Sequence, residues 1–516
     1  GAGVMSFPLR IDPGPPMLHV SLFVELLRSR PRFMMWAATL AQAALWWLVP
    51  VIFYSAPPGD LALTIAVGGE FNLGSFWGPP LAYWLANIAF VIAGMPGVYL
   101  LAQACVVVTY WAVFRLGQSI VGIHHAALAI LLMIGISALS VPTPTFGPPV
   151  LAMPLTALAL LHFWRALGEG KRSYSFLLAG DLALLILTTH SGLILLGAII
   201  VFTLASERGR AMLMTIEPWI AAIIIVVILF PHLIWLDMSG MGWTWLSRLR
   251  YDRPGEWSLV LWLRQLAALA VAHTGALVLV ALSSGWGDVG EKPPVFQRKP
   301  LTDFERWFVL FFAIALPLAT TVVGASLGER SPVGRISPNV VLSGLALVVL
   351  AGNAIELHRQ WLTGLAWSVL LIAPPAFAAF GLLAAPFYGD TPIPTAQPAK
   401  SIGRFFGETF ERRTGKRLEI VAGDPRLASL IALYARGRPS LYLANAPERT
   451  PWVTAEELKQ KGGIVVWTAT DTAGAPPPEI RFLFPDIVPE VPHTFDYFIQ
   501  GRLPLLRVGW GMLRPQ

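Results

Sequence analysis

Repeated long apolar runs constrain this chain more than any other feature of its sequence. A helix needs about 20 apolar residues to cross the hydrocarbon core of a membrane, because each residue advances it by about 1.5 Å. Runs of about this length lie at 33–54, 97–117, 123–140, 149–166, 174–189, 191–206, 217–236, 259–283, 307–327, 338–356 and 363–385. Charged residues make up only 13% of the chain, against about 25% in soluble domains. The pattern predicts a polytopic α-helical membrane protein with about eleven transmembrane helices.

The distribution of Lys and Arg predicts which side of the membrane each connection faces, because cytoplasmic loops carry an excess of these residues. With an odd number of spans and a cytoplasmic N-terminus, the loops 55–96 and 141–148, which contain no Lys or Arg, face outward. The C-terminal part then lies outside as well, as in a multi-pass protein of the bacterial inner membrane with a periplasmic C-terminal domain. If the two runs that meet at His190 formed a single helix, the later spans would be inverted.

The net charge of +7 does not indicate nucleic-acid binding, because the basic residues form short clusters between the apolar runs. The single cysteine, Cys105, lies inside an apolar run, so an intrachain disulfide is excluded. The sequence contains no Walker, HExxH or CxxC motif. These features favour lipid partners over nucleotides and nucleic acids.

The chain divides into three parts by composition. Residues 1–32 form a cytoplasmic segment, whose amphipathic stretch Met17–Leu27 predicts a helix at the membrane surface. Residues 33–387 form the transmembrane domain. Residues 388–516 begin with a Pro-rich linker and then alternate short strands with helices. This alternation predicts a small, soluble, mainly parallel α/β domain on the outer side of the membrane.

The outward connection 55–96, termed the outer loop, carries acids at the membrane edge. Asp60 comes a few residues after the first span, and Glu70 follows in the same loop. An aspartate before a helix often serves as its cap, and a helix that begins at Leu61 would give Asp60 that structural role. The alternative is a chemical role, because a carboxylate at this position could accept a proton from a substrate.

Four segments in chain order carry a resemblance to a known family. They are Asp60 with the later Pro-Pro-Leu81 and its aromatic-rich helix, Thr188–Gly192, Arg330–Pro338, and the strand that ends in Gly-Asp424. They resemble polytopic GT-C glycosyltransferases that use polyprenyl-phosphate sugars, such as the protein O-mannosyltransferases and the lipid A aminoarabinose and galacturonic acid transferases. His190 stands where many family members have a lysine. The resemblance implies a GT-C-like fold followed by an extracytoplasmic domain.

The resemblance also implies a function. A sugar would pass from a polyprenyl-phosphate donor to a lipid, glycan or protein acceptor of the envelope, with inversion at the anomeric carbon. Asp60 would be the catalytic base that deprotonates the acceptor hydroxyl. Cationic side chains on outer loops would bind the donor phosphate, because guanidinium groups offer it paired hydrogen bonds. The expected phosphate ligands are His190, Arg248, Arg250, Arg330 and Arg335.

The sequence departs from the family pattern at two positions. The acid pair that usually follows the first span is Asp60-Leu61 here, and the loop after the third span offers Thr143 and Thr145 where relatives have a second acid. Glu70 is therefore a candidate second acid. The departures leave the binding of a divalent metal open, and no cofactor is assigned.

Two other functions are compatible with the sequence. A transporter or flippase could also have about eleven spans and intramembrane histidines such as His232, which lies near the outer end of its span. Against it, no inverted repeat is visible and the Gly/Pro-interrupted segments are not paired between the two halves. An inactive relative that only binds polyprenyl lipid is the other alternative, because the second acid is missing.

Overall fold

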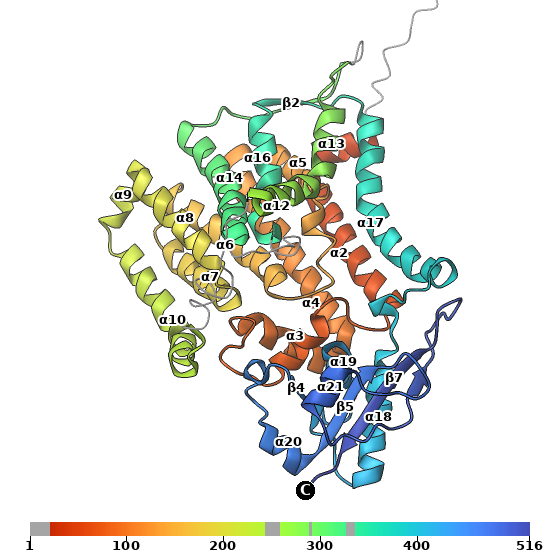
Figure 1. Cartoon of the computed structure of the whole chain (residues 1–516). Helices are drawn as coiled ribbons and strands as arrows, with labels where there is room; N and C mark the ends of the chain where they lie inside the picture. Colours follow the sequence, from red (N-terminus) through yellow and green to blue (C-terminus); the bar gives the residue numbers. More distant parts are fainter. Residues whose placement is uncertain (1–20, 243–258, 288–291, 327–335) are drawn as a thin grey trace, which may run out of the picture.

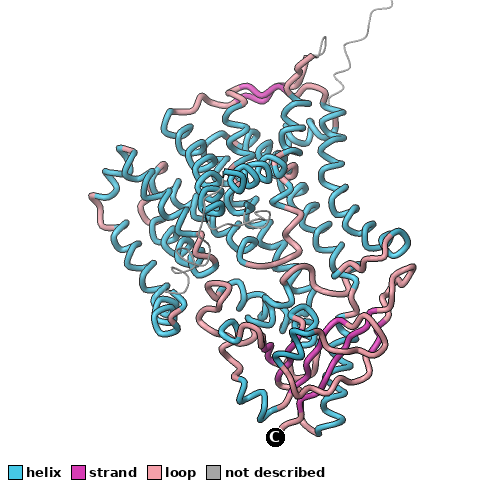
Figure 2. Tube along the Cα trace, viewed as in Figure 1, coloured by secondary structure: helices cyan, strands magenta, loops and turns pink. Residues whose placement is uncertain are grey.

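A computed structural model describes residues 21–242, 259–287, 292–326 and 336–516 of the chain. The described residues form a large helical bundle with a smaller region of mixed helices and strands at one end (Figure 1). Colouring by secondary structure shows that most strands lie in this smaller region (Figure 2). We term residues 388–516 the C-terminal region. α17 runs along one side of the bundle and connects the two parts (Figure 1).

The bundle consists of helices that follow one another closely along the chain. They are α1 (Leu22–Ser29), α2 (Pro31–Phe53), α3 (Leu61–Gly68), α4 (Leu81–Val121), α5 (Ile123–Met133), α6 (Pro148–Leu167), α7 (Tyr174–Thr188), α8 (Gly192–Ala205), α9 (Glu207–Leu213), α10 (Glu217–Ser239), α12 (Leu259–Ala272), α13 (Thr274–Ser283), α14 (Asp303–Ser326), α16 (Ser343–Leu350) and α17 (Gln360–Tyr388). The short strands β1 (Val295–Gln297) and β2 (Ala354–Glu356) pair antiparallel. They lie at the end of the bundle opposite to the C-terminal region (Figure 1).

Six of these helices are long and apolar enough to cross a membrane, and the number rises to eight if each of two bent helix pairs counts as one span. The bent pairs are α8 with α9 and α12 with α13. Three further apolar helices, Ile123–Met133, Tyr174–Thr188 and Ser337–Leu350, are shorter. The predicted class of a polytopic helical protein is therefore confirmed. The predicted total of about eleven spans is not reached by length and composition alone.

α4 joins the last part of the outer loop and the second predicted span in one bent helix. A straight helix of its 41 residues would be about 60 Å long, roughly twice the thickness of the hydrocarbon core. Gly94 interrupts it with φ 66° and ψ −158°, a conformation that glycine adopts readily, and Pro96 follows within the next turn. The predicted boundary between the outer loop 55–96 and the apolar run 97–117 falls at this bend.

Aromatic side chains pack the interior of the bundle. α6 is the most buried of the long apolar helices and packs against α4 and α7. Phe163 of α6 meets Phe202, Phe308 and Phe312 from α8 and α14, with ring centroids 5.0–6.1 Å apart within this group. Such contacts contribute beyond the burial of area alone. They hold α6, α8 and α14 against one another.

The C-terminal region holds a mixed sheet. Its elements are α18 (Ala399–Thr414), β3 (Ile420–Gly423), α19 (Pro425–Tyr434), β4 (Ser440–Tyr442), α20 (Ala455–Lys461), β5 (Gly463–Thr468), α21 (Pro478–Leu483), β6 (His493–Phe495) and β7 (Leu506–Leu513). The strand order is β4-β3-β5-β7-β6, in which β3 pairs parallel with β4 and β5, and β7 pairs antiparallel with β5 and β6. The predicted strands correspond to β3, β4 and β5. The prediction of a mainly parallel sheet is wrong, because the glycines of β7 and the prolines before β6 conceal two antiparallel strands in the sequence.

Alternate residues of the strands face two layers of helices, as the period of two requires. Val421 and Val466 belong to the core that includes α18 and α19, whereas Ala422 and Trp467 belong to the core with α20 and α21. The first of these cores continues into the bundle, where Leu61 of α3 is fully buried. The outer loop and its helix α3 are therefore enclosed between the bundle and the C-terminal region (Figure 1).

Candidate functional site

Asp60 lies immediately before α3, on an exposed part of the outer loop. Its backbone carbonyl accepts hydrogen bonds from the amide and the hydroxyl of Thr64, at 2.9 and 3.0 Å. Its carboxylate makes no capping hydrogen bond to α3. The structural alternative, in which the Asp60 side chain caps the helix, therefore does not hold, and the carboxylate lies exposed at the start of α3.

Gly59 determines how the chain enters α3. Its φ of 51° lies in the left-handed region that glycine adopts without strain. A Cβ atom at this position would lie 3.1 Å from Cγ2 of Thr145. The loop that follows the third predicted span therefore packs against the backbone beside Asp60, and it presents a threonine where the family pattern has a second acid.

A guanidinium from the C-terminal region holds the outer loop. Arg426, near the start of α19, donates hydrogen bonds to the carbonyl oxygens of Gly59 at 3.0 Å and Pro57 at 2.8 Å. The same side chain donates to the carbonyl oxygen of Pro394 and to Oε1 of Gln397, both at 3.1 Å. Arg426 and these four acceptors, termed the loop clamp, tie the outer loop, the Pro-rich linker and α19 together.

Electrostatics and backbone pairing strengthen this junction. Burial lowers the pKa of the Arg426 guanidinium, and the negative charge of Asp60 opposes that shift. The amides of Ser55 and Ala56 donate to the carbonyl oxygen of Thr395, at 2.9 and 3.0 Å. The segment that leads to Asp60 is thus fixed by backbone and side-chain contacts to the linker.

Glu70 lies beyond the other end of α3, where different contacts hold it. The hydroxyl of Ser440 donates to Oε1 of Glu70 at 2.7 Å. Burial raises the pKa of the Glu70 carboxyl, although the Ser440 hydrogen bond and the charge of Arg438 oppose the shift. The eight residues of α3 extend over about 12 Å. The structure therefore does not bring Glu70 and Asp60 together as an acid pair, and Glu70 instead joins the outer loop to β4.

His190 lies in the turn between α7 and α8 and meets His232 of α10. Their Nε2 atoms are 3.1 Å apart. Nδ1 of His232 lies 2.7 Å from the carbonyl oxygen of Leu73, which can only accept, so Nδ1 carries a hydrogen. In the neutral ring of His232, Nε2 is then the acceptor and Nε2 of His190 the donor. The two histidines thus link the α7–α8 turn to the outer loop.

This environment decides the charge of His190. Burial, together with the neighbouring His232, lowers the pKa of His190 to about 4. His190 is therefore neutral at pH 7 unless an anion lies beside it. A phosphate group near the ring would favour the charged form.

The other predicted phosphate ligands, Arg248, Arg250, Arg330 and Arg335, lie outside the described residues. Within the described part of the chain, no three His, Cys, Asp or Glu side chains gather where they could hold a metal ion. The described candidates therefore form two groups on the outer loop: Asp60 lies beside the loop clamp and Thr145 before α3, and the histidine pair contacts the loop at Leu73 beyond α3.

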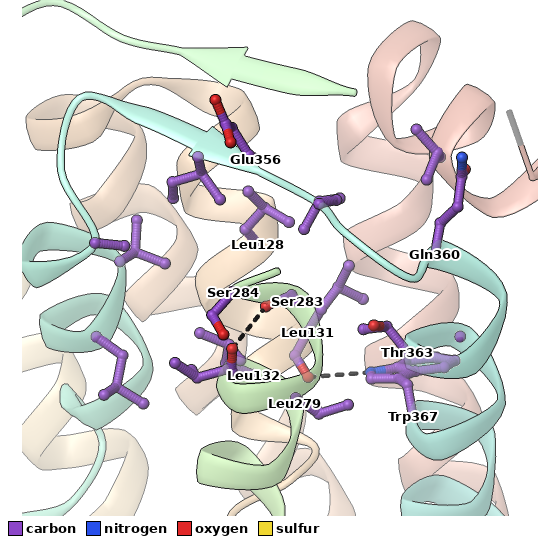
Figure 3. Close-up of a pocket in the computed structure, with 18 of the residues that line it drawn as sticks. Leu128, Leu131, Leu132, Leu279, Ser283, Ser284, Glu356, Gln360, Thr363 and Trp367 are labelled. Atoms are coloured by element: carbon purple, nitrogen blue, oxygen red, sulfur yellow. Dashed lines mark hydrogen bonds between the residues drawn. The ribbon is translucent and has the colours of Figure 1, made fainter. Parts of the chain in front are cut away.

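A cavity of about 410 Å³ lies at the end of the bundle opposite to the C-terminal region. Helices α1, α5, α13, α16 and α17 line it together with β2, mostly with apolar side chains (Figure 3). Within it, the indole of Trp367 donates to the carbonyl oxygen of Leu131 at 3.0 Å (Figure 3). The bundle separates this cavity from α3 (Figure 1), so it is not part of the Asp60 site.

The sequence prediction missed Arg426. The only local signal is its position after Gly-Asp-Pro at the start of a predicted helix, where an exposed arginine is ordinary. Its role depends on the packing of α19 along α3. Arg426 meets the loop before α3, whereas Arg438, which follows α19, donates to the Ile65 carbonyl farther along α3.

Comparisons with known proteins support the fold class. Residues 78–235 match the family described as dolichyl-phosphate-mannose-protein mannosyltransferase. The match runs from Gly78 in the outer loop to Trp235 in α10, so it includes His190 and His232 but not Asp60. A search among curated proteins finds no match.

Among solved structures, the chain is similar to ArnT from Cupriavidus metallidurans. For ArnT bound to undecaprenyl phosphate, the TM-score is 0.57 at 12% identity, over 93% of this chain and 99% of that chain. For apo ArnT, the TM-score is 0.58 at 13% identity, with the same coverage. The apo oligosaccharyltransferase from Archaeoglobus fulgidus is 14% identical, with a TM-score of 0.46 over 85% of this chain and 69% of that chain. The likeness to ArnT thus extends over nearly the whole of both chains.

Proposed function

Because the chain has the GT-C fold and resembles the polytopic glycosyltransferases of that class, we propose that it transfers a sugar from a polyprenyl-phosphate donor to an acceptor of the cell envelope. The observation that carries the proposal is Asp60, an exposed carboxylate on a loop that the clamp fixes from the C-terminal region. The ArnT structure bound to undecaprenyl phosphate supports a polyprenyl-phosphate carrier. In this proposal the reaction takes place on the periplasmic face of the bacterial inner membrane.

The proposed reaction exchanges one bond for another at the anomeric carbon. Asp60 accepts the proton of the acceptor hydroxyl while the hydroxyl oxygen attacks the anomeric carbon. The bond between this carbon and the phosphate oxygen breaks, and the electron pair leaves with the polyprenyl phosphate. Attack opposite to the leaving group inverts the configuration.

Cationic groups would stabilise the charge on the departing phosphate. We assign this role to His190 together with Arg248, Arg250, Arg330 and Arg335 from the outer loops. Glu70 is left out of the chemistry, because Ser440 holds it beyond the far end of α3.

A transfer assay tests the proposed function. Purified full-length protein in lipid nanodiscs is incubated with a panel of undecaprenyl-phosphate sugars and an envelope extract as acceptor source. Free undecaprenyl phosphate is quantified by mass spectrometry. Release that needs both the protein and the extract supports the proposal. Movement of intact donor across vesicle membranes, with no carrier released, would identify a transporter instead.

We propose eleven spans, with the N-terminus in the cytoplasm and the C-terminal region in the periplasm. Six long helices, two bent pairs and three shorter apolar helices supply the eleven. An odd number places the two ends of the chain on opposite sides. Protease added to right-side-out vesicles should therefore cut within the C-terminal region and leave an N-terminal tag intact. Cleavage of the C-terminal region only in inverted vesicles would reverse this topology.

Binding of undecaprenyl phosphate should weaken as the pH rises. The pKa of His190 is about 4 without a bound anion, because of burial and His232. A bound phosphate raises this pKa by favouring the charged ring, so binding takes up a proton at any pH between the free and the bound values. In that window the Kd should rise up to about ten-fold for each pH unit. Titration of the protein in nanodiscs from about pH 5 to about pH 9 measures this slope.

Three variants test whether His190 causes the dependence of the Kd on pH. His190→Lys should flatten it, because a lysine keeps its charge throughout this range. His190→Ala should raise the Kd at low pH and also remove the slope. His124→Ala is the matched control, because this ring packs on Phe296 of β1 at the far end of the bundle. A Kd that His190→Ala leaves unchanged at every pH would make His190 a structural turn residue.

A further inference from the structure

A second cavity, of about 220 Å³, lies in the C-terminal region where the parallel strands end. β3 ends at Gly423, β4 at Tyr442 and β5 at Thr468, and residues at or just after these ends line the cavity. Apolar side chains of α21 line it from another side. Ligands of α/β sheets commonly bind at the carboxyl ends of parallel strands, because the turns there bring backbone and short polar groups together. We term this space the edge cavity.

The lining combines polar groups with apolar side chains, of which Trp467 is fully buried. Trp467 is held in place by its Nε1, which donates to the Gly474 carbonyl oxygen at 3.2 Å. Asp424, Asn445 and Glu479 add two carboxylates and an amide. Asn445 and Glu479 are exposed, so both can reach a ligand without a change of the fold.

The charge of the lining selects among ligand classes. Asp424 and Glu479 are acidic, and none of the described residues that line the edge cavity is basic. Carboxylates repel phosphate, so the donor's phosphate does not fit there. Sugar hydroxyls and amines donate to carboxylates and amides, while the apolar face of a sugar ring packs on aromatic and aliphatic side chains. The volume suits one sugar residue better than a lipid chain or an oligosaccharide.

The edge cavity is joined to the loop that carries Asp60. Asp424 and Pro425 line the cavity, and the next residue, Arg426, donates to the Gly59 carbonyl oxygen at 3.0 Å. The Asp424 side chain also accepts the Leu427 amide at 3.0 Å, which fixes the turn at the start of α19. One short turn therefore lines the cavity on one side and clamps the outer loop on the other.

We propose that the edge cavity binds one uncharged or amino sugar residue of the acceptor and so holds the acceptor near Asp60. The acceptor role rests on the proposed function, whereas sugar binding itself does not. The acidic lining makes the cavity specific for the acceptor side of the reaction and excludes the phosphate carrier.

Ligand-observed NMR on the full-length protein in nanodiscs tests the proposal. Nanodiscs are required because maltoside detergents would compete for a sugar site. The probes are N-acetylglucosamine and glucosamine, with glucose 6-phosphate as the anionic comparison. The first two should bind more tightly than the third. Asn445→Ala removes a hydrogen-bonding amide, and Glu479→Gln removes the negative charge that strengthens a hydrogen bond from the glucosamine ammonium, so each should raise the Kd of glucosamine by roughly ten-fold.

Glu456→Gln is the matched control. Glu456 is an exposed acid in the first turn of α20, as Glu479 is in the first turn of α21, and it does not line the edge cavity. Binding of none of the probes, tighter binding of glucose 6-phosphate, or equal Kd values for Glu479→Gln and Glu456→Gln would overturn the proposal. Sugar binding without any release of undecaprenyl phosphate in the transfer assay would contradict the proposed function and leave the sugar site standing.

Discussion

Replacement of Asp60 by asparagine should abolish sugar transfer and leave the protein folded. Asparagine has nearly the same shape, but its amide cannot take up the proton of the acceptor hydroxyl. Loss of a general base typically lowers a rate about 100-fold to 10,000-fold. The exposed carboxylate of Asp60 makes no capping hydrogen bond, and Asp60→Asn leaves the hydrogen bonds of the loop clamp to Pro57 and Gly59 in place. Release of undecaprenyl phosphate by the protein in nanodiscs is the measurement.

Asp390→Asn is the control for this substitution. Asp390 is an exposed aspartate two residues after the end of α17, at the start of the linker, and its replacement should leave the rate unchanged. The Kd of undecaprenyl phosphate should be similar in Asp60→Asn and in the unmodified protein. Near-normal turnover by Asp60→Asn would remove this residue from the mechanism.

Arg426→Ala should lower both stability and turnover. The change leaves the carbonyl oxygens of Pro57 and Gly59 without their charged donor. A hydrogen bond to a charged group contributes about 1.5–3 kcal/mol, so we expect the free energy of unfolding to fall by about 2–4 kcal/mol. We also expect kcat to fall at least about ten-fold, because a displacement of about 1 Å at a catalytic group can lower a rate about 100-fold. Thermal unfolding and the transfer assay measure the two effects.

Arg426→Lys separates charge from geometry. Lysine keeps the positive charge but lacks the planar fork that reaches several acceptors, so kcat should be intermediate. Arg404→Ala removes an exposed arginine of α18 and should match the unmodified protein in both measurements. If Arg426→Ala unfolds more readily yet keeps its full kcat, the loop clamp supports the fold without positioning the base.

Features that depend on local sequence could be predicted. Apolar length alone indicates the class of the bundle, since a run of about 20 apolar residues has few alternatives to a span. The start of the apolar run 97–117 could also be predicted, and α4 bends just before it at Gly94. Asp60 could be singled out because it is a lone acid near the end of an apolar run.

Features that depend on distant partners could not be predicted. The α7–α8 turn identifies His190 as a surface residue, but nothing in the turn indicates that His232 of α10 lies 3.1 Å away and lowers its pKa. The sequence around Glu70 suggests a second acid, but it does not indicate that Ser440 of β4 binds this carboxylate. The position of Thr145 beside Gly59 depends on the packing of two loops that are far apart in the sequence.

The loop clamp also sets the order in which the active site is completed during synthesis. Arg426 follows Gly59 in the chain by 367 residues. At about 5–20 residues per second, the outer loop exists for on the order of 20–70 s before its guanidinium partner is made. The first helices enter the membrane during this interval, while the segment that carries Asp60 still lacks the contact that fixes it. A chain whose translation stops before Arg426 therefore inserts with an outer loop that lacks this contact, and the proposed active site is complete only after the C-terminal region has folded.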